Sequence, residues 1–86
     1  MFYVYVLKSK GNDRLYFGYS EDLKRRIAEH KAGKVYSTKH RLPIELVYYE
    51  AYKNKEDAQL REKGFKHSGS VYNGLVKRIK KSLMGP

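Results

Sequence analysis

Two short tyrosine-bearing segments, separated by a turn, set the strongest limit on the fold of this chain. Residues 2–9 and 14–19 are rich in Val, Tyr and Phe and alternate in character, which is typical of β-strands. Gly, Asn and Asp within residues 10–13 favour a turn between them. The sequence therefore predicts an antiparallel hairpin that carries Tyr5 on its first strand and Tyr16, eleven positions later, on its second.

A basic helix is expected to follow the hairpin directly. Ser20 is a suitable N-cap, and Glu21 and Asp22 would then lie in the first turn, where acidic groups suit the positive end of a helix. The helix is predicted to run to about Ala32 and to end at Gly33.

The rest of the chain predicts one more strand and two more helices. The elements expected, in order, are a basic loop at residues 34–42, a strand at 44–52, a helix capped by Asn54, a break at 67–70 and a helix at about 71–83. The order ββαβαα predicts an α/β protein of the α+β kind, with a small three-stranded, mainly antiparallel sheet flanked by helices. We expect a single domain over residues 1–84 and a C-terminal tail at 85–86.

The charge balance indicates the kind of partner rather than the fold. Nineteen Lys and Arg against nine Asp and Glu give a formal net charge of +10, which favours a polyanion such as nucleic acid over an anionic membrane surface. The chain has no cysteine, which excludes disulfides and thiolate metal sites and suits a cytoplasmic protein. No apolar run approaches the roughly 20 residues that a membrane span needs.

Helical periodicity singles out Arg26 and His30 in the first helix. At about 100° per residue, Arg26 lies about 60° and His30 about 20° from the core-facing Leu23, whereas Arg25 lies on the opposite side. A charged group beside an apolar stripe needs a reason, because burying an unpaired charge is costly. For Arg26 the structural alternatives are a snorkelling side chain or an ion pair. For His30 the alternative is a helix-end residue with local hydrogen bonds.

The same reasoning selects one acid in the second helix. Glu62 lies about 40° from Ala58, on the face that also carries Phe65. Glu56 and Asp57, by contrast, lie in the first turn, where acids are expected. Glu62 is therefore interpreted as a ligand for Mg²⁺ or Mn²⁺, with an ion pair to Arg61, Lys66 or Arg26 as the structural alternative.

These residues, taken in order, resemble the GIY-YIG nuclease family. The similarity is to its short single-domain members and to the N-terminal nuclease domain of the excision-repair nuclease UvrC. The matching segments are Tyr3-Val4-Tyr5, Tyr16-Phe17-Gly18, Asp22-Leu23-Lys24-Arg25-Arg26 followed by His30, Ser37-Thr38, Arg41-Leu42-Pro43, Tyr48-Tyr49-Glu50 and Leu60-Arg61-Glu62-Lys63. The similarity spans nearly the whole chain. It departs from the family pattern at Tyr3, which replaces a glycine.

The resemblance implies a metal-dependent endonuclease that hydrolyses phosphodiester bonds in DNA, in DNA repair or processing. Glu62 would hold one divalent ion, Mg²⁺ or Mn²⁺, that stabilises the leaving oxygen. Arg26 would bind the scissile phosphate. Tyr16, from its place in the second motif, would act as general base, and Tyr5 would orient either the attacking water or Tyr16. His30 is included among the catalytic candidates.

A phenol with a pKa of about 10 is a weak base at neutral pH, and nearby cations would make its phenolate easier to form. Lys24 would contribute to that positive field. The residues Lys39, His40 and Arg41 in the basic loop are candidate phosphate contacts without base specificity. The family's C-terminal asparagine has one candidate, Asn73, whose helical phase points away from the apolar stripe.

Other functions stay open at this level. The main alternative is a non-catalytic, basic nucleic-acid-binding module on the same fold. A structural protein of a ribonucleoprotein particle also fits the charge and size. DNA is favoured over RNA as the partner, no membrane is expected, and a homodimer or a protein partner stays open because the chain carries no separate DNA-binding domain.

Overall fold

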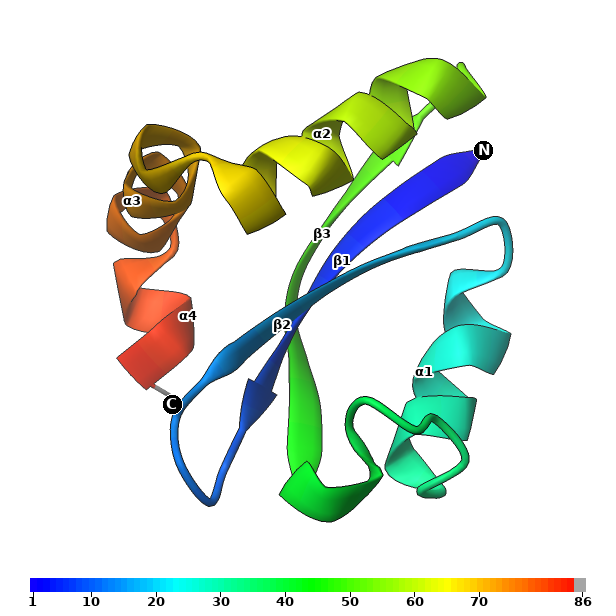
Figure 1. The fold of residues 1–86 in the computed structure, drawn as a ribbon, viewed down its shortest axis with the longest axis vertical. Helices are drawn as coiled ribbons and strands as arrows, with labels where there is room; N and C mark the ends of the chain where they lie inside the picture. Colours follow the sequence, from blue (N-terminus) through cyan, green and yellow to red (C-terminus); the bar gives the residue numbers. More distant parts are fainter. Residues whose placement is uncertain (85–86) are drawn as a thin grey trace.

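The computed structural model, which describes residues 1–84, contains a three-stranded antiparallel sheet with helices on both faces (Figure 1). β1 (Phe2–Ser9) is the central strand, and β2 (Leu15–Ser20) and β3 (Ile44–Tyr52) pair with it on either side. The predicted α+β class and the order ββαβαα are confirmed. The predicted tail at 85–86 lies outside the described residues.

The strands form where the alternating Val, Tyr and Leu residues predicted them. The predicted bounds of β1 and β3 are those observed, and β2 begins and ends one residue later than predicted. The pairing of β1 with β3 shifts between Val6, which faces Tyr48, and Leu7, which faces Leu46. Val47 is thus an extra residue in β3, which is the pattern of a β-bulge.

The helices divide the core into two layers. α1 (Leu23–Lys31) packs on the sheet face that carries Tyr5 and Leu7. The other face carries Val4 and Val6 and is covered by α2 and α3, as Figure 1 shows. The bounds of the remaining helices are Lys55–His67 for α2, Gly69–Arg78 for α3, Lys80–Met84 for α4 and Lys39–Arg41 for the short 3-10 helix η1.

α1 begins later than predicted. The side chain of Asp22, not Ser20, accepts a hydrogen bond from the backbone N–H of Arg25, so Asp22 is the N-cap and the first turn contains no acid. Ser20 instead exchanges hydrogen bonds with the backbone of Asp22 and so shapes the approach to the helix. A short side chain that bonds its own neighbouring backbone in this way competes with capping.

The end of α1 is as predicted. Gly33 has a φ of +74° and donates its N–H to the carbonyl of His30, while the N–H of Lys34 bonds the carbonyl of Glu29. This pair of bonds is a Schellman motif, which suits glycine because the left-handed backbone carries no Cβ penalty there. The last turn of α1 is thereby fixed around His30.

The C-terminal helices are interrupted at other positions than predicted. Asn54 caps α2 as predicted, through its bond from the N–H of Glu56. The predicted break at residues 67–70 is confined to Ser68, which ends α2 and caps α3. The single helix predicted at 71–83 is instead two, because Ile79 leaves helical geometry with φ −109° and ψ 26°. None of the helices within residues 1–84 is long and apolar enough to cross a membrane.

Candidate active site

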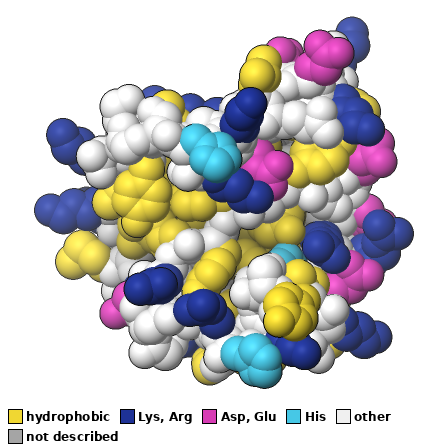
Figure 2. Space-filling model, in the orientation of Figure 1, with side chains coloured by type: hydrophobic (Ala, Val, Ile, Leu, Met, Phe, Trp, Pro, Cys, Tyr) yellow, Lys and Arg dark blue, Asp and Glu magenta, His cyan; other side chains and the backbone are white. Residues whose placement is uncertain are grey.

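A pocket of about 580 Å³ lies along β2, an edge strand of the sheet. Its position lets side chains from both layers reach it around the strand edge. Figure 2 shows hydrophobic side chains exposed across the middle of this face, with Lys and Arg side chains between and around them. The lining comprises Tyr5, residues 15–19, Arg26, His30, Ser37, Thr38, Glu62, Phe65, Lys66 and Tyr72.

The cross-strand pair of Tyr5 and Gly18 shapes the floor of the pocket. The two residues face each other in the β1–β2 register. A Cβ placed on Gly18 would lie 2.2 Å from both Cζ and Oη of Tyr5. Ordinary carbon contacts are about 3.5–4.0 Å, so the phenol ring occupies the space that a side chain at residue 18 would need. This close approach explains the glycine of the Tyr16-Phe17-Gly18 segment.

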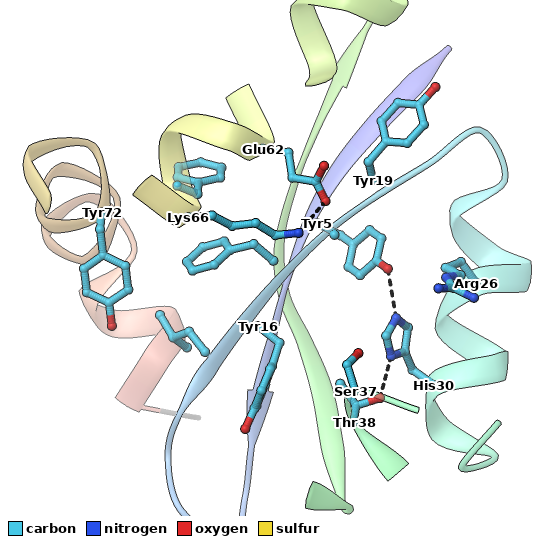
Figure 3. Close-up of a pocket in the computed structure, with 14 residues that line it drawn as sticks. Tyr5, Tyr16, Tyr19, Arg26, His30, Ser37, Thr38, Glu62, Lys66 and Tyr72 are labelled. Atoms are coloured by element: carbon cyan, nitrogen blue, oxygen red, sulfur yellow. Dashed lines mark hydrogen bonds and ion pairs between the residues drawn. The ribbon is translucent and has the colours of Figure 1, made fainter. Parts of the chain in front are cut away.

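A chain of hydrogen bonds joins Tyr5 to His30 and Thr38. The Tyr5 hydroxyl lies 2.8 Å from Nε2 of His30, and Nδ1 of His30 lies 2.7 Å from Oγ1 of Thr38 (Figure 3). The rings of Tyr5 and His30 meet edge to face, at 71°. All three side chains are buried, with exposed fractions of 4% or less. The hydrogen bonds of His30 do not lie within its own helix, because its partners are 25 residues before it, on β1, and eight residues after it, beside η1.

The surroundings keep both Tyr5 and His30 in their neutral forms near neutral pH. Burial raises the pKa of the Tyr5 phenol above 10, and the opposing attraction of Arg26 does not offset it. Burial and the nearby Arg26 charge both lower the pKa of His30 below 6.5. A neutral phenol thus faces a neutral imidazole, so Tyr5 can donate a hydrogen bond to the ring, while both pKa directions oppose a full transfer of the proton at rest.

Arg26 lies where its helical phase predicted, beside the Tyr5–His30 pair (Figure 3). The Tyr5 oxygen, as a hydrogen-bond acceptor, raises the pKa of Arg26, and Glu29 adds to the effect. The ion-pair alternative is also present, since Nη1 of Arg26 lies 3.2 Å from Oε1 of Glu29. The pair is partly exposed on both sides and is therefore weak, which leaves the guanidinium available to an anion in the pocket. Arg25 is exposed to solvent, as predicted.

Glu62 reaches the same pocket from α2, on the opposite side of β2. Its Oε2 lies 3.2 Å from Nζ of Lys66, so of the three ion pairs considered for it the structure has the one with Lys66 (Figure 3). The Glu62 side chain is 22% exposed, and its charge raises the pKa of Tyr5, which places it within electrostatic reach of that phenol.

The donor set at Glu62 fits a divalent ion bound through one carboxylate. Within residues 1–84, no three His, Asp or Glu side chains gather as a ready metal cage. Mg²⁺ is commonly held by one or two carboxylates with water and substrate phosphate completing its shell, so Glu62 alone is an adequate protein anchor. A cation there would compete with Lys66 for the carboxylate.

Tyr16 takes part in the pocket differently from Tyr5. Its ring lies under the guanidinium of Arg41, with Cζ 5.4 Å from the ring centroid. Among the described residues, its buried hydroxyl has no hydrogen-bond partner, and the same is true of Tyr19. In Figure 3 the Tyr16 hydroxyl points away from His30. Only Tyr5 of these phenols has a base at hydrogen-bond distance.

The other predicted site residues lie outside the pocket lining. Lys24 lies on a separate groove between α1 and β3. Lys39, His40 and Arg41 form η1, beside the pocket, and Arg41 reaches it through Tyr16. Asn73 is exposed on α3 and does not line the pocket. The structure thus brings together Tyr5, Tyr16, Arg26, His30 and Glu62.

Sequence reasoning assigns no site role to Gly18 or Thr38, and it names Lys66 only as one of three possible ion-pair partners of Glu62. The resemblance had included Thr38 in a matching segment, but a threonine in a basic loop carries no periodicity that would show its contact with His30. Lys66 follows Glu62 by four residues, which is the spacing of a helical ion pair, and that signal was available. The need for Gly18 depends on the strand register, which no local pattern supplies.

A carboxylate on β3 anchors the helix that carries Glu62. Glu50 accepts hydrogen bonds from the hydroxyls of Tyr48 and Tyr52 and from Nε and Nη2 of Arg61, the last two at 2.9 and 3.1 Å. Burial and the bond to Glu50 raise the pKa of Tyr52 to about 12. Arg61 also stacks on Phe65. This bidentate contact ties α2 to the sheet one residue before Glu62.

Comparison with known proteins agrees with this geometry. Residues 1–80 match the sequence model of the family described as GIY-YIG catalytic domain. Two UPF0213 proteins of Streptococcus pyogenes, from strains Manfredo and MGAS10270, are each 48% identical over 65 residues, which cover 74% of this chain and 70% of theirs. UPF0213 is a designation that states no activity.

A solved structure is also similar. The solution NMR structure of a UPF0213 protein from Bacillus halodurans superposes with a TM-score of 0.57 at 39% identity, over 90% of this chain and 84% of that one. The family match over residues 1–80, together with a pocket that gathers the tyrosine, arginine and glutamate of its motifs, shows that the chain belongs to the GIY-YIG family of nuclease-type domains and to its short UPF0213 branch.

Proposed function

We propose that this protein is an endonuclease that hydrolyses phosphodiester bonds in DNA. The observation that carries the proposal is the pocket at β2, where Arg26 and the Tyr5–His30 pair approach from one layer and Glu62 from the other. A phosphate in this space would meet a guanidinium, a phenol backed by a base and a carboxylate. A cytoplasmic location and a role in DNA repair or processing are part of the same proposal.

Arg26 would bind the scissile phosphate. Its contact with Glu29 is half exposed, so a phosphate can replace that carboxylate at little cost. A guanidinium donates two parallel N–H bonds to phosphate oxygens, and such bonds become most valuable when charge grows on those oxygens in the transition state. Arg41 and Lys39 on η1 would contact flanking phosphates and contribute affinity without base specificity.

The Tyr5–His30 pair would activate water. The Tyr5 oxygen takes a proton from the attacking water as its own proton passes to Nε2 of His30, and the water oxygen bonds to phosphorus in the same step, so that no free phenolate forms beforehand. The bond from phosphorus to the leaving oxygen breaks, and the proton on His30 passes through solvent to that oxygen, which restores the neutral pair. The family motif favoured Tyr16 as the base, but the contact with His30 favours Tyr5.

Glu62 would hold one Mg²⁺ or Mn²⁺ after releasing Lys66. When bound, this ion supplies positive charge that stabilises the leaving oxygen. Lys66, once displaced, stays in the pocket lining as a further cation for the phosphate. The ion would raise the net charge of the pocket, and the displacement of Lys66 would leave its ammonium group available to the phosphate.

The second candidate function is a non-catalytic nucleic-acid-binding module. The pair of Glu62 with Lys66 favours it, because the lysine neutralises the carboxylate and leaves the pocket positive without a metal ion. Such a module would bind nucleic acid with strong salt dependence and would cleave nothing.

A cleavage assay separates the two functions. Purified protein is incubated with duplex, branched and single-stranded DNA and with RNA, in Mg²⁺, in Mn²⁺ or in chelator. We expect metal-dependent cutting of DNA that Glu62→Gln abolishes and Glu56→Gln, the same change at an exposed acid of α2, preserves. Cutting by Glu62→Gln at the wild-type rate would overturn the metal assignment. Binding without cleavage on any substrate or metal would select the binding module.

A further inference from the structure

His30 lies between two hydroxyl groups, and its tautomer decides what each of them does. Nε2 lies 2.8 Å from the Tyr5 oxygen, and Nδ1 lies 2.7 Å from Oγ1 of Thr38. A neutral imidazole has one N–H, so one ring nitrogen donates and the other accepts. Which nitrogen holds the hydrogen is set by the bond that the other makes.

The Tyr5 side of the ring favours an accepting Nε2. A phenol is a stronger acid than an aliphatic alcohol, so Tyr5 is the better donor of the two hydroxyls that flank the ring. Arg26, which lines the pocket beside Tyr5, can only donate and does not compete for the phenol hydrogen. The hydrogen of the neutral phenol is then free to point to Nε2. In this arrangement the single ring N–H must be at Nδ1, and its acceptor is Oγ1 of Thr38.

On the other side of the ring, the Thr38 hydroxyl bonds His30 rather than capping its own helix. Thr38 is at the N-cap position of η1, where a threonine commonly accepts a bond from its own helix. It makes no such bond, and its side chain, 1% exposed, bonds His30 instead. The backbone beside it is held independently, since Oγ of Ser9 donates to the carbonyl of Arg41 at 2.8 Å.

We propose that Thr38 is a positioning residue that holds His30 as the Nδ1–H tautomer and so keeps Nε2 available to take the Tyr5 proton. The role toward catalysis rests on the proposed nuclease function, whereas the tautomer itself does not. The arrangement has the parts of an activated nucleophile, with a hydroxyl, a base and a third group that orients the base. Because Thr38 immediately precedes η1, it also links the basic loop to this pair.

The tautomer can be measured without substrate or metal. In protein labelled with ¹⁵N-histidine, the ring nitrogen shifts and their couplings to ring hydrogens distinguish the two tautomers. The exposed His40 and His67 provide internal references that exchange freely with solvent. We expect wild-type His30 to be mainly Nδ1–H. Thr38→Ser should keep that signature, and Thr38→Val, which retains the shape without the hydroxyl, should shift the population toward Nε2–H.

The catalytic arm uses the same variants. Thr38→Val should lower kcat about tenfold, the size of one neutral hydrogen bond, with KM little changed, and Thr38→Ser should restore most of the rate. A wild-type His30 that is mainly Nε2–H, or a Thr38→Val protein with the wild-type signature, would overturn the proposal. So would a Thr38→Val enzyme that cuts at the full rate. If wild-type protein cuts nothing, the nuclease function fails while the tautomer result stands on its own.

Discussion

Substituting Gly18 of β2 with alanine should displace the Tyr5 ring and so disrupt the candidate active site. The new Cβ would lie 2.2 Å from Cζ and Oη of Tyr5 and 2.7 Å from Cε1. Relief to a normal contact of about 3.5 Å requires the ring to move by more than about 1 Å. Tyr5 is only 3% exposed, so the ring has little free space, and its hydroxyl would leave His30.

The cost has two parts. Overpacking in a filled interior costs about 1–3 kcal/mol, and the lost hydrogen bond adds about 1 kcal/mol. We therefore expect Gly18→Ala to lower the free energy of unfolding by about 3 kcal/mol. For a domain of this size that corresponds to a fall in Tm of roughly 12–24 °C.

Chemical denaturation and thermal melting measure this effect. Gly74→Ala is the matched control, because Gly74 lies inside α3 with no neighbouring atom within 4 Å of an added Cβ. That substitution should stabilise the protein by about 0.5–1 kcal/mol through helix propensity. In a Tyr5→Leu background, Gly18→Ala should cost much less than in wild type, since the overlapping atoms are gone. A Gly18→Ala protein with wild-type stability and an intact Tyr5–His30 bond would refute the reasoning.

Three further predictions follow from the charged groups. Lys66→Met should tighten Mn²⁺ binding by up to about fivefold, because the partly exposed ion pair of Lys66 with Glu62 is worth at most about 1 kcal/mol. An unchanged Mn²⁺ affinity in calorimetric titration would contradict the idea that Lys66 and the metal ion compete for Glu62. Glu50→Ala should cost about 2 kcal/mol in urea denaturation by leaving Arg61 without its bidentate partner, and a loss below about 0.5 kcal/mol would show that the contact is not stabilising. Because the pKa of His30 is lowered in the folded protein, the unfolded chain takes up a proton at a higher pH than the folded one. The free energy of unfolding should therefore fall as pH drops from about 6.5 toward the folded-state pKa. His30→Gln should flatten this pH dependence of stability, and an equal pH dependence in both proteins would contradict a lowered His30 pKa.

Much of the fold could be predicted because its signals are local. The alternation of β1 and β3, the glycine that ends α1 and the asparagine that caps α2 are each determined by neighbouring residues. The N-cap of α1 could not be predicted as well, because Ser20 and Asp22 are both good caps and the choice depends on how the chain leaves β2. The end of α3 at Ile79 could not be predicted either, because no proline or glycine marks it.

The site was predictable where helical phase determined it. Periodicity separates Arg26 from Arg25 and places Glu62 on the apolar face, since a helix turns by a fixed angle per residue. Glu56 is set aside because acids are expected in the first turn of a helix. The contacts of Thr38 and Gly18 depend on a loop and a strand register that only the folded chain establishes. The preference for Tyr5 over Tyr16 likewise needed the position of His30 in space.

The measurement that tests the central claim most directly compares Arg26→Ala with Arg25→Ala in single-turnover DNA cleavage. The two variants lose the same charge from adjacent positions of one helix, so their nonspecific affinity for DNA should fall equally. Arg26 lines the pocket, whereas Arg25 is exposed to solvent away from it. We expect Arg26→Ala to cut at least about 100-fold more slowly than wild type, as for loss of a donor to a charged transition state, and Arg25→Ala to remain within about threefold. Equal cutting rates for the two variants would show that the pocket at β2 is not where the phosphodiester is broken.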